Sequence, residues 1–138
     1  MSKKKLTIIL EKGNDELWGR IDTPGSFLLT TVGNSMEEVT ANLRDLVADF
    51  LENEGKELPE WQGISESDIT YQFEYDMTAI FDVFNAIKMS AIAASAGINP
   101  SLVRQYATGK KHPSERQAKR IEMAIQELGS RLMHVRVV

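Results

Sequence analysis

The sequence predicts an α+β protein in two parts, with strands around one helix in residues 1–76 and helices alone in residues 77–138. Four short runs of β-branched and aromatic residues, separated by turn residues, lie before position 76. After that position apolar residues recur at three- and four-residue steps, as in helices. The charge divides at the same place: residues 1–76 hold seven Lys and Arg against sixteen Asp and Glu, and residues 77–138 hold nine against four.

The first three runs are expected to form an antiparallel meander. They are Leu6–Leu10, Leu17–Ile21 and Phe27–Val32. Residues 12–15 and 22–25, which are rich in Gly, Asn, Asp and Pro, separate them, and Gly33 with Asn34 ends the third run. Connections this short are typical of hairpins.

A helix follows, with Ser35 as its N-cap and Glu38 as the partner residue of a capping box. The apolar stripe expected to bury against the sheet comprises Met36, Val39, Leu43, Leu46, Val47 and Phe50. Gly55 is the expected stop, and residues 53–68 are predicted to be a loop or linker in which Trp61 is a packing anchor. Ile69 to Tyr75 alternates apolar and polar residues as a half-buried strand does, which completes a βββαβ unit.

The C-terminal part begins with a helix after Met77, whose expected inward residues are Ile80, Phe81, Phe84 and Ile87. The next segment fits two helices that meet at a steep angle, which need a small residue at the crossing and a residue that tolerates positive φ in the turn. Ala93 and Gly97 are such residues, and Ile98 then places an apolar side chain in the core.

The second helix of this pair is expected over residues 99–108. Asn99 is a good N-cap, and proline suits the first helical position that Pro100 occupies. Its inner face, turned toward Ile92, would comprise Val103 with Leu102 or Tyr106, and Gly109 would end it. The two helices therefore predict a helix-turn-helix motif.

A last helix is expected to start at a second capping box formed by Ser114 and Gln117. Its inward residues would be Ala118, Ile121, Ala124, Ile125 and Leu128, and its other faces carry Arg116, Lys119 and Arg120. Gly129 lies near its end. Residues 133–138 have strand character, and a short exposed strand can pair with a second copy to make a dimer or dock on its own subunit.

The run from Met89 to Tyr106 resembles the Xre/Cro-type helix-turn-helix of repressors. This resemblance implies that the helix over residues 99–108 is a recognition helix, so that its outer face and surroundings are the candidate site. The candidate DNA-binding residues are Ser90, Asn99, Ser101, Arg104, Gln105, Thr108, Lys110 and Lys111. Arg104 is suited to guanine and Gln105 to adenine through bidentate hydrogen bonds, although either can instead hold a phosphate. Lys110, Lys111 and His112 follow as a phosphate clamp, the alternative being plain solvation after a helix end, and Ser90 can also meet a phosphate.

Composition and charge narrow the classes of partner and activity that this protein can have. The basic half favours a polyanionic partner, and the acidic half favours a neutral or basic one unless its charges only solvate a surface. The chain has no cysteine, which fits a cytoplasmic protein, and no apolar stretch long enough to cross a membrane. The carboxylates Asp15, Asp22, Asp49 and Asp76 follow no motif spacing, so neither a metal site, a cofactor nor an enzymatic activity is expected.

The N-terminal part, with Thr23-Pro24-Gly25 before the third strand and Ser35-Met36-Glu37-Glu38-Val39 opening the helix, looks like the HicB antitoxin fold, a partial ribonuclease H-like unit. The chain departs from that pattern at Gly25-Ser26-Phe27, where many members have Gly-Cys.

This resemblance implies a transcriptional repressor, a homodimer or higher homo-oligomer, that is the antitoxin of a toxin–antitoxin system. The N-terminal domain would neutralise a small basic RNA-cleaving toxin of the HicA type, and the C-terminal domain would bind double-stranded DNA at the operon's own promoter. The alternative is a helix-turn-helix regulator whose N-terminal domain binds a small ligand, or only dimerises, without a toxin partner.

Overall fold

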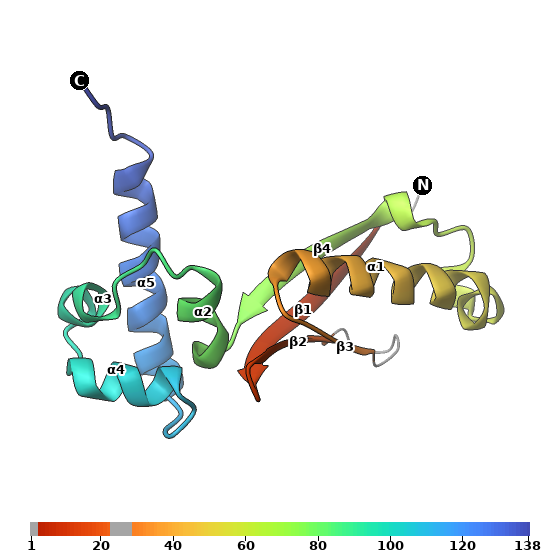
Figure 1. The fold of residues 1–138 in the computed structure, drawn as a ribbon. Coiled ribbons are helices and arrows are strands. Elements are labelled where there is room, and N and C mark those ends of the chain that lie inside the picture. The colour runs from red at the N-terminus through yellow and green to blue at the C-terminus, as the bar shows by residue number, and fades with distance from the viewer. Residues whose placement is uncertain (1–2, 23–28) are drawn as a thin grey trace. The chain divides into compact units, whose positions relative to one another are not determined.

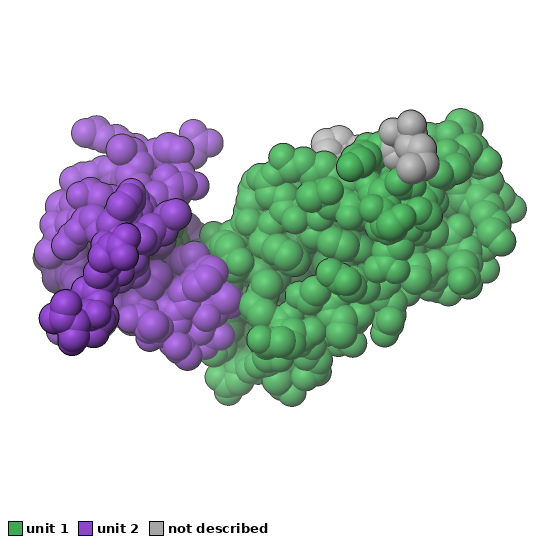
Figure 2. All heavy atoms as spheres, turned by 90° about the horizontal axis from the view of Figure 1, so that it is seen from above, with its two compact units in different colours: residues 1–79 green, residues 80–138 purple. Residues whose placement is uncertain are grey.

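The computed structural model describes residues 3–22 and 29–138, and it divides into two compact units, residues 1–79 and 80–138 (Figure 2). Over the described residues the chain forms a four-stranded mixed sheet and five α-helices, which confirms the α+β class. The division falls inside helix α2 (Met77–Val83), three residues after the boundary expected at position 76.

Unit 1 is built on a sheet with the strand order β3-β2-β1-β4 (Figure 1). Strands β1 (Lys4–Gly13), β2 (Glu16–Ile21) and β3 (Thr30–Gly33) form the predicted antiparallel meander. Asn14 and Asp15, with φ of 52° and 62°, make the two-residue β1–β2 turn, because positive φ at both positions suits the strand twist. The expected start of the third strand at Phe27, like residues 23–26, lies outside the described residues.

Strand β4 (Ile69–Tyr75) lies parallel to β1 at the edge of the sheet. The register pairs Leu6 with Tyr71, Ile8 with Phe73 and Leu10 with Tyr75, so the half-buried side of β4 continues the buried side of β1. The βββαβ order is thus confirmed.

Helix α1 (Met36–Glu52) covers one face of this sheet (Figure 1). The Ser35 hydroxyl accepts the Glu38 amide at 3.1 Å, which gives the Ser35 half of the expected capping box. The predicted stripe faces the sheet and its buried members are Val39, Leu43, Val47 and Phe50, opposite Leu6, Ile8 and Leu10, which are each 0% exposed.

The stretch predicted as a loop or linker is a packed part of unit 1. It contains three short 3₁₀ helices, η1 (Glu54–Glu57), η2 (Pro59–Trp61) and η3 (Glu66–Asp68). Trp61 is only 2% exposed; its ring meets Phe50 edge-on at 5.2 Å, and Lys4 Nζ lies 5.1 Å from its centre, so the expected anchor is confirmed. Gly55 does not stop α1, which ends at Glu52 with Asn53 as its cap.

Unit 2 contains helices α3 (Met89–Ala96), α4 (Pro100–Ala107) and α5 (Glu115–Leu132). These three helices supply the buried side chains Ile92, Ala93, Ala96, Val103, Tyr106, Ile121 and Ala124, and Phe81 of α2 and Ile98 of the turn after α3 are buried as well. The expected inward position of Phe84 is wrong, since this residue is 42% exposed. Helix α2 ends at Val83, so the helical period that predicted a buried Phe84 no longer applies there.

Residues 133–138 form no strand in this chain, and all of them are exposed. A strand exists only when a neighbour supplies backbone hydrogen bonds, and the described part of unit 2 contains no strand to do so. The expected docking of this tail as a strand on its own subunit is therefore wrong, whereas pairing with a second copy stays a prediction.

Candidate nucleic-acid interface

The corner between α3 and α4 is a three-residue turn, residues 97–99. Gly97 adopts the left-handed conformation, with φ of 70° and ψ of 34°. Its amide donates to the Ala94 carbonyl at 3.2 Å and the Ile98 amide donates to the Ala93 carbonyl at 2.9 Å, which together form a Schellman motif. Ile98 is 6% exposed, so the residue after the corner enters the core as predicted.

Helix α4 starts directly after this corner. The Asn99 side-chain oxygen accepts the Ser101 amide at 2.8 Å, and Pro100 occupies the first turn. Asn99 is therefore an N-cap, and its side-chain oxygen is already used in a hydrogen bond within the protein. Its role in this structure is to position α4.

The two faces of α4 differ sharply in exposure. Val103 is 0% and Tyr106 5% exposed, and both contribute to the core of unit 2. Ser101 and Arg104 are exposed, as predicted. The helix thus has one face for its own fold and one face available to a partner.

Gln105 departs from its expected outward position. Its side chain is half-buried, and its Oε1 atom is covered with no hydrogen-bond partner among the described residues. The chain after α4 folds back over this turn, because the Thr108 hydroxyl and the Lys111 amide both donate to the Gln105 carbonyl at 3.2 Å. Thr108 is exposed, but its hydroxyl is used by this helix end.

Two lysines follow α4 in an anchored loop. Gly109, with φ of 78°, turns the chain, and the hydrogen bond from the Lys111 amide to the Gln105 carbonyl then fixes the loop against the last turn of α4. Lys110, Lys111 and His112 are all exposed, and Arg104 lies in that last turn. The backbone beside Arg104 is therefore held while the cationic side chains remain in solvent.

The remaining cations of unit 2 are spread over its helices. Residues 80–138 hold nine Lys and Arg against four Asp and Glu. Lys119 pairs with Glu122 at 2.7 Å, whereas Lys88 and Arg116 are exposed without a described ion pair. Ser90 lies exposed in the first turn of α3, where its hydroxyl can reach a ligand.

Arg120 has a role that the sequence analysis missed. Its Nη2 donates to the Gly97 carbonyl at 3.1 Å, and its Nη1 donates to the Gln117 side-chain oxygen at 3.0 Å. Gln117 is thus turned toward Arg120, and only the Ser114 half of the second expected capping box forms, with the Gln117 amide 3.2 Å from the Ser114 hydroxyl. The only signal in the sequence was the three-residue spacing of Gln117 and Arg120.

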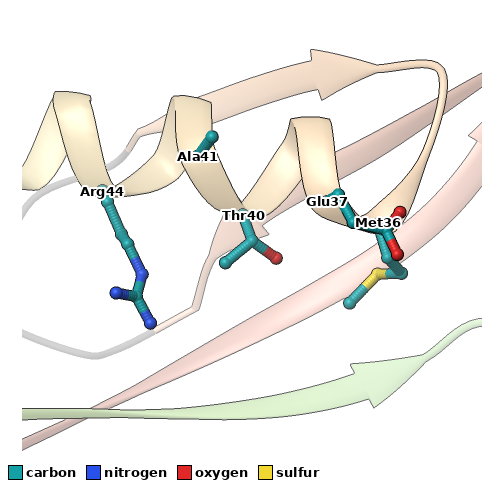
Figure 3. Close-up of a pocket in the computed structure, with 5 residues that line it drawn as sticks. All are labelled: Met36, Glu37, Thr40, Ala41 and Arg44. Carbon is teal, nitrogen blue, oxygen red and sulfur yellow. The ribbon is translucent and has the colours of Figure 1, made fainter.

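Unit 1 contains an open hollow of about 400 Å³ beside α1. Its lining residues all come from that helix and are Met36, Glu37, Thr40, Ala41 and Arg44 (Figure 3). The Arg44 guanidinium also lies 6.0 Å from the centre of the Tyr71 ring. Burial raises the pKa of Tyr71, with Glu66 adding to the rise and Arg44 opposing it. The hollow is open and lined from a single helix, unlike the concave sites that enclose most small ligands.

Residues 37–60 form a second charged feature, which we call the acidic segment. It carries eight Asp and Glu against Arg44 and Lys56, and all ten of these side chains are exposed. No group of three or more His, Asp or Glu that could hold a metal ion occurs within residues 3–22 and 29–138. None of the helices in those ranges is long and apolar enough to span a bilayer.

Comparisons of the chain with protein-family models, with curated proteins and with solved structures found no match.

Proposed function

We propose that this protein is a sequence-specific DNA-binding transcriptional repressor and that α4 is its recognition helix. The observation that carries the proposal is the division of α4, which buries Val103 and Tyr106 and leaves Ser101 and Arg104 in solvent. The Asn99 cap and the anchored loop after α4 support it, since a helix that enters a major groove must be presented rigidly.

Each exposed residue has a distinct part in this proposal. Arg104 reads guanine through two parallel hydrogen bonds, and Ser101, near the N-terminal end of α4, meets a base edge or a phosphate. Lys110 and Lys111 bind phosphates, as does Ser90 from the start of α3. Asn99 and Thr108 hold the two ends of α4. Gln105 can read adenine only after its side chain turns outward, because bidentate reading needs both the oxygen and the nitrogen of its amide, and the oxygen is covered.

The net positive charge of unit 2 supports this function over a generic helical hairpin. A duplex carries about one negative charge per 1.7 Å of axis, so cations around a groove-binding helix supply most of the sequence-independent affinity. The resemblance to Xre/Cro-type repressors adds the expectation of a dimer that reads two half-sites.

The test is binding of the full chain to the duplex upstream of its own gene, followed by fluorescence anisotropy from about 50 to 300 mM salt. A shuffled duplex of equal length and composition is the control. We expect tighter binding to the upstream duplex at every salt concentration and a steep loss of affinity with salt for both. Equal affinity for the two duplexes would contradict sequence-specific recognition, and binding to neither would end the proposal.

We further propose that unit 1 neutralises a small basic RNA-cleaving toxin, so that the protein acts as an antitoxin and represses its own operon. The acidic segment supports this partner, because its exposed carboxylates suit a positively charged surface. The tagged protein should co-purify with the product of an adjacent small basic reading frame. If no such frame exists, or if its product is never retained, the protein is a DNA-binding regulator without a toxin.

A further inference from the structure

Arg120 is well placed to influence α4 without belonging to it. Helix α4 packs mainly on α3, and α3 packs on α5. The position of α4 against the rest of unit 2 therefore depends on α3 and on the turn at residues 97–99. Arg120 joins α5 directly to that turn across 23 positions of sequence through its bond to the Gly97 carbonyl.

The geometry around Gly97 is specific to this bond. A Cβ atom at position 97 would lie 2.8 Å from Arg120 Nη2, so the absence of a side chain is what lets the guanidinium approach. The side-chain oxygen of Gln117, one turn earlier on α5, accepts a hydrogen bond from the other guanidinium nitrogen, Nη1, at 3.0 Å. The guanidinium is thus oriented before it meets the turn, which reduces the entropy lost in making a charge-assisted bond.

We infer that Arg120 is a positioning residue for DNA recognition: it fixes the α3–α4 turn and so sets how α4 is presented, without contacting DNA itself. This inference rests on the proposed DNA binding of unit 2. The competing role for an arginine in a basic unit is a direct phosphate contact, and the two roles predict different dependence on salt. Losing a phosphate contact lowers the slope of log affinity against log salt by about one, whereas losing a positioning bond leaves the slope unchanged.

The test uses the full chain with Arg120→Met, which removes all donors and keeps an apolar stem. Arg131→Met is the matched control, because Arg131 is an exposed cation in the last turn of the same helix. Amide hydrogen exchange without DNA reports on the turn, and anisotropy with the upstream duplex across a salt series reports on recognition.

We expect Arg120→Met to speed exchange of the amides of residues 97–99 and of Ser101 several-fold, since the turn loses a hydrogen bond. The central amides of α5 should be unchanged, because the second hydrogen bond that is lost, to the Gln117 side chain, involves no backbone group of that helix. Affinity should fall about tenfold with an unchanged salt slope, the size of one charge-assisted hydrogen bond. Arg131→Met should change neither exchange at the turn nor affinity by more than about twofold. Arg120→Lys keeps the charge and one donor group, so it should restore part of the lost affinity. It also allows the same measurements if Arg120→Met does not fold.

Unchanged exchange at residues 97–99 and Ser101 would overturn the inference, and so would a slope lowered by about one. Because the exchange measurement needs no DNA, it separates this inference from the function on which it rests. Faster exchange in Arg120→Met, together with a wild type that binds no duplex, would keep Arg120 as a structural bond only and would refute both the repressor and the positioning role.

Discussion

Arg104 and Gln105 are neighbours on α4, yet the structure gives them different surroundings. Arg104 is exposed, whereas the Gln105 side chain is half-buried and its backbone carbonyl accepts a hydrogen bond from the Lys111 amide in the loop after α4. Residue type suggests a base-reading role for both. Because Arg104 is exposed and the Oε1 atom of Gln105 is covered, the larger share of sequence reading is assigned to Arg104.

Arg104→Ala should therefore weaken binding to the operator and broaden sequence preference. Losing one bidentate base contact costs about 1–3 kcal/mol, and the loss should be smaller on a shuffled duplex. Anisotropy titrations on both duplexes measure the ratio of affinities. An unchanged ratio would remove Arg104 from base reading.

Lys111→Ala provides the contrasting case, because the hydrogen bond from the backbone amide of residue 111 to the Gln105 carbonyl does not depend on the side chain. Binding to every duplex should weaken alike, and the slope of log affinity against log salt should fall by about one. The same titrations across a salt series measure this slope. A loss confined to the operator would instead make Lys111 a base-reading residue.

Gly97 and Gly129 allow a matched test of backbone conformation. Gly97→Ala places a side chain at φ of 70° and displaces Arg120 Nη2, so the free energy of unfolding should fall by at least about 1–2 kcal/mol. Gly129 lies inside α5 with open space around it, and Gly129→Ala should raise that free energy by about 0.5–1 kcal/mol. Urea unfolding compares the two, and equal effects would contradict the account of the corner.

Among the elements, the 3₁₀ helix η3 carries the most complete cap of unit 1. The Asp68 carboxylate accepts the Ser65 amide at 3.0 Å and the Ser65 hydroxyl at 3.2 Å, directly before β4. The Ser65 amide lowers the pKa of Asp68 most, desolvation opposes this, and the Ser65 hydroxyl and Lys3 lower it further. Residue spacing predicted capping boxes at Ser35 and Ser114, whereas the box that forms in full is the one at Ser65.

Asp68→Asn should lower the free energy of unfolding at neutral pH, because the carboxylate is a stronger acceptor than an amide. A depressed pKa in the folded state stabilises the fold above the ordinary aspartate pKa of about 3.9 and loses that contribution as the pH falls through the folded value. The difference between wild type and variant should therefore shrink below about pH 4. Urea unfolding at a series of pH values measures it, and a constant difference would contradict a charged cap.

At the scale of the whole molecule, unit 1 is acidic and unit 2 is basic. The apolar side chains of the C-terminal tail, residues 133–138, are exposed. Val135 is 60% and Val137 91% exposed, and they alternate with His134 and Arg136. Two such tails can pair as strands and bury the valines on one side. This pairing would supply the dimer that reading two half-sites requires.

The double variant Val135→Ser, Val137→Ser should therefore be monomeric at concentrations where the wild type is dimeric. Its thermal unfolding, measured on the dilute monomer, should be nearly unchanged, since both side chains are exposed in the single chain. Sedimentation equilibrium measures the association, and Arg136→Gln, on the other side of the alternation, is the control. Identical association of wild type and double variant would place the dimer interface elsewhere.

The sequence was sufficient to predict features that depend on residues close together in the chain. The Ser35 and Asn99 caps, the Gly97 corner and the alternation in β4 are of this kind. Each is decided by interactions within about one helical turn or one strand, so residue type and spacing carry the necessary information.

Only the tertiary structure decided the features that join distant residues. These are the parallel pairing of β4 with β1, the packing of Trp61 on Phe50 and the bond from Arg120 to Gly97. For each of these interactions the sequence contains several residues of suitable chemistry. Which of them interact depends on which surfaces the folded chain brings together. For the same reason the exposure of Arg104 could be predicted from its helix, whereas the burial of the Gln105 Oε1 atom could not.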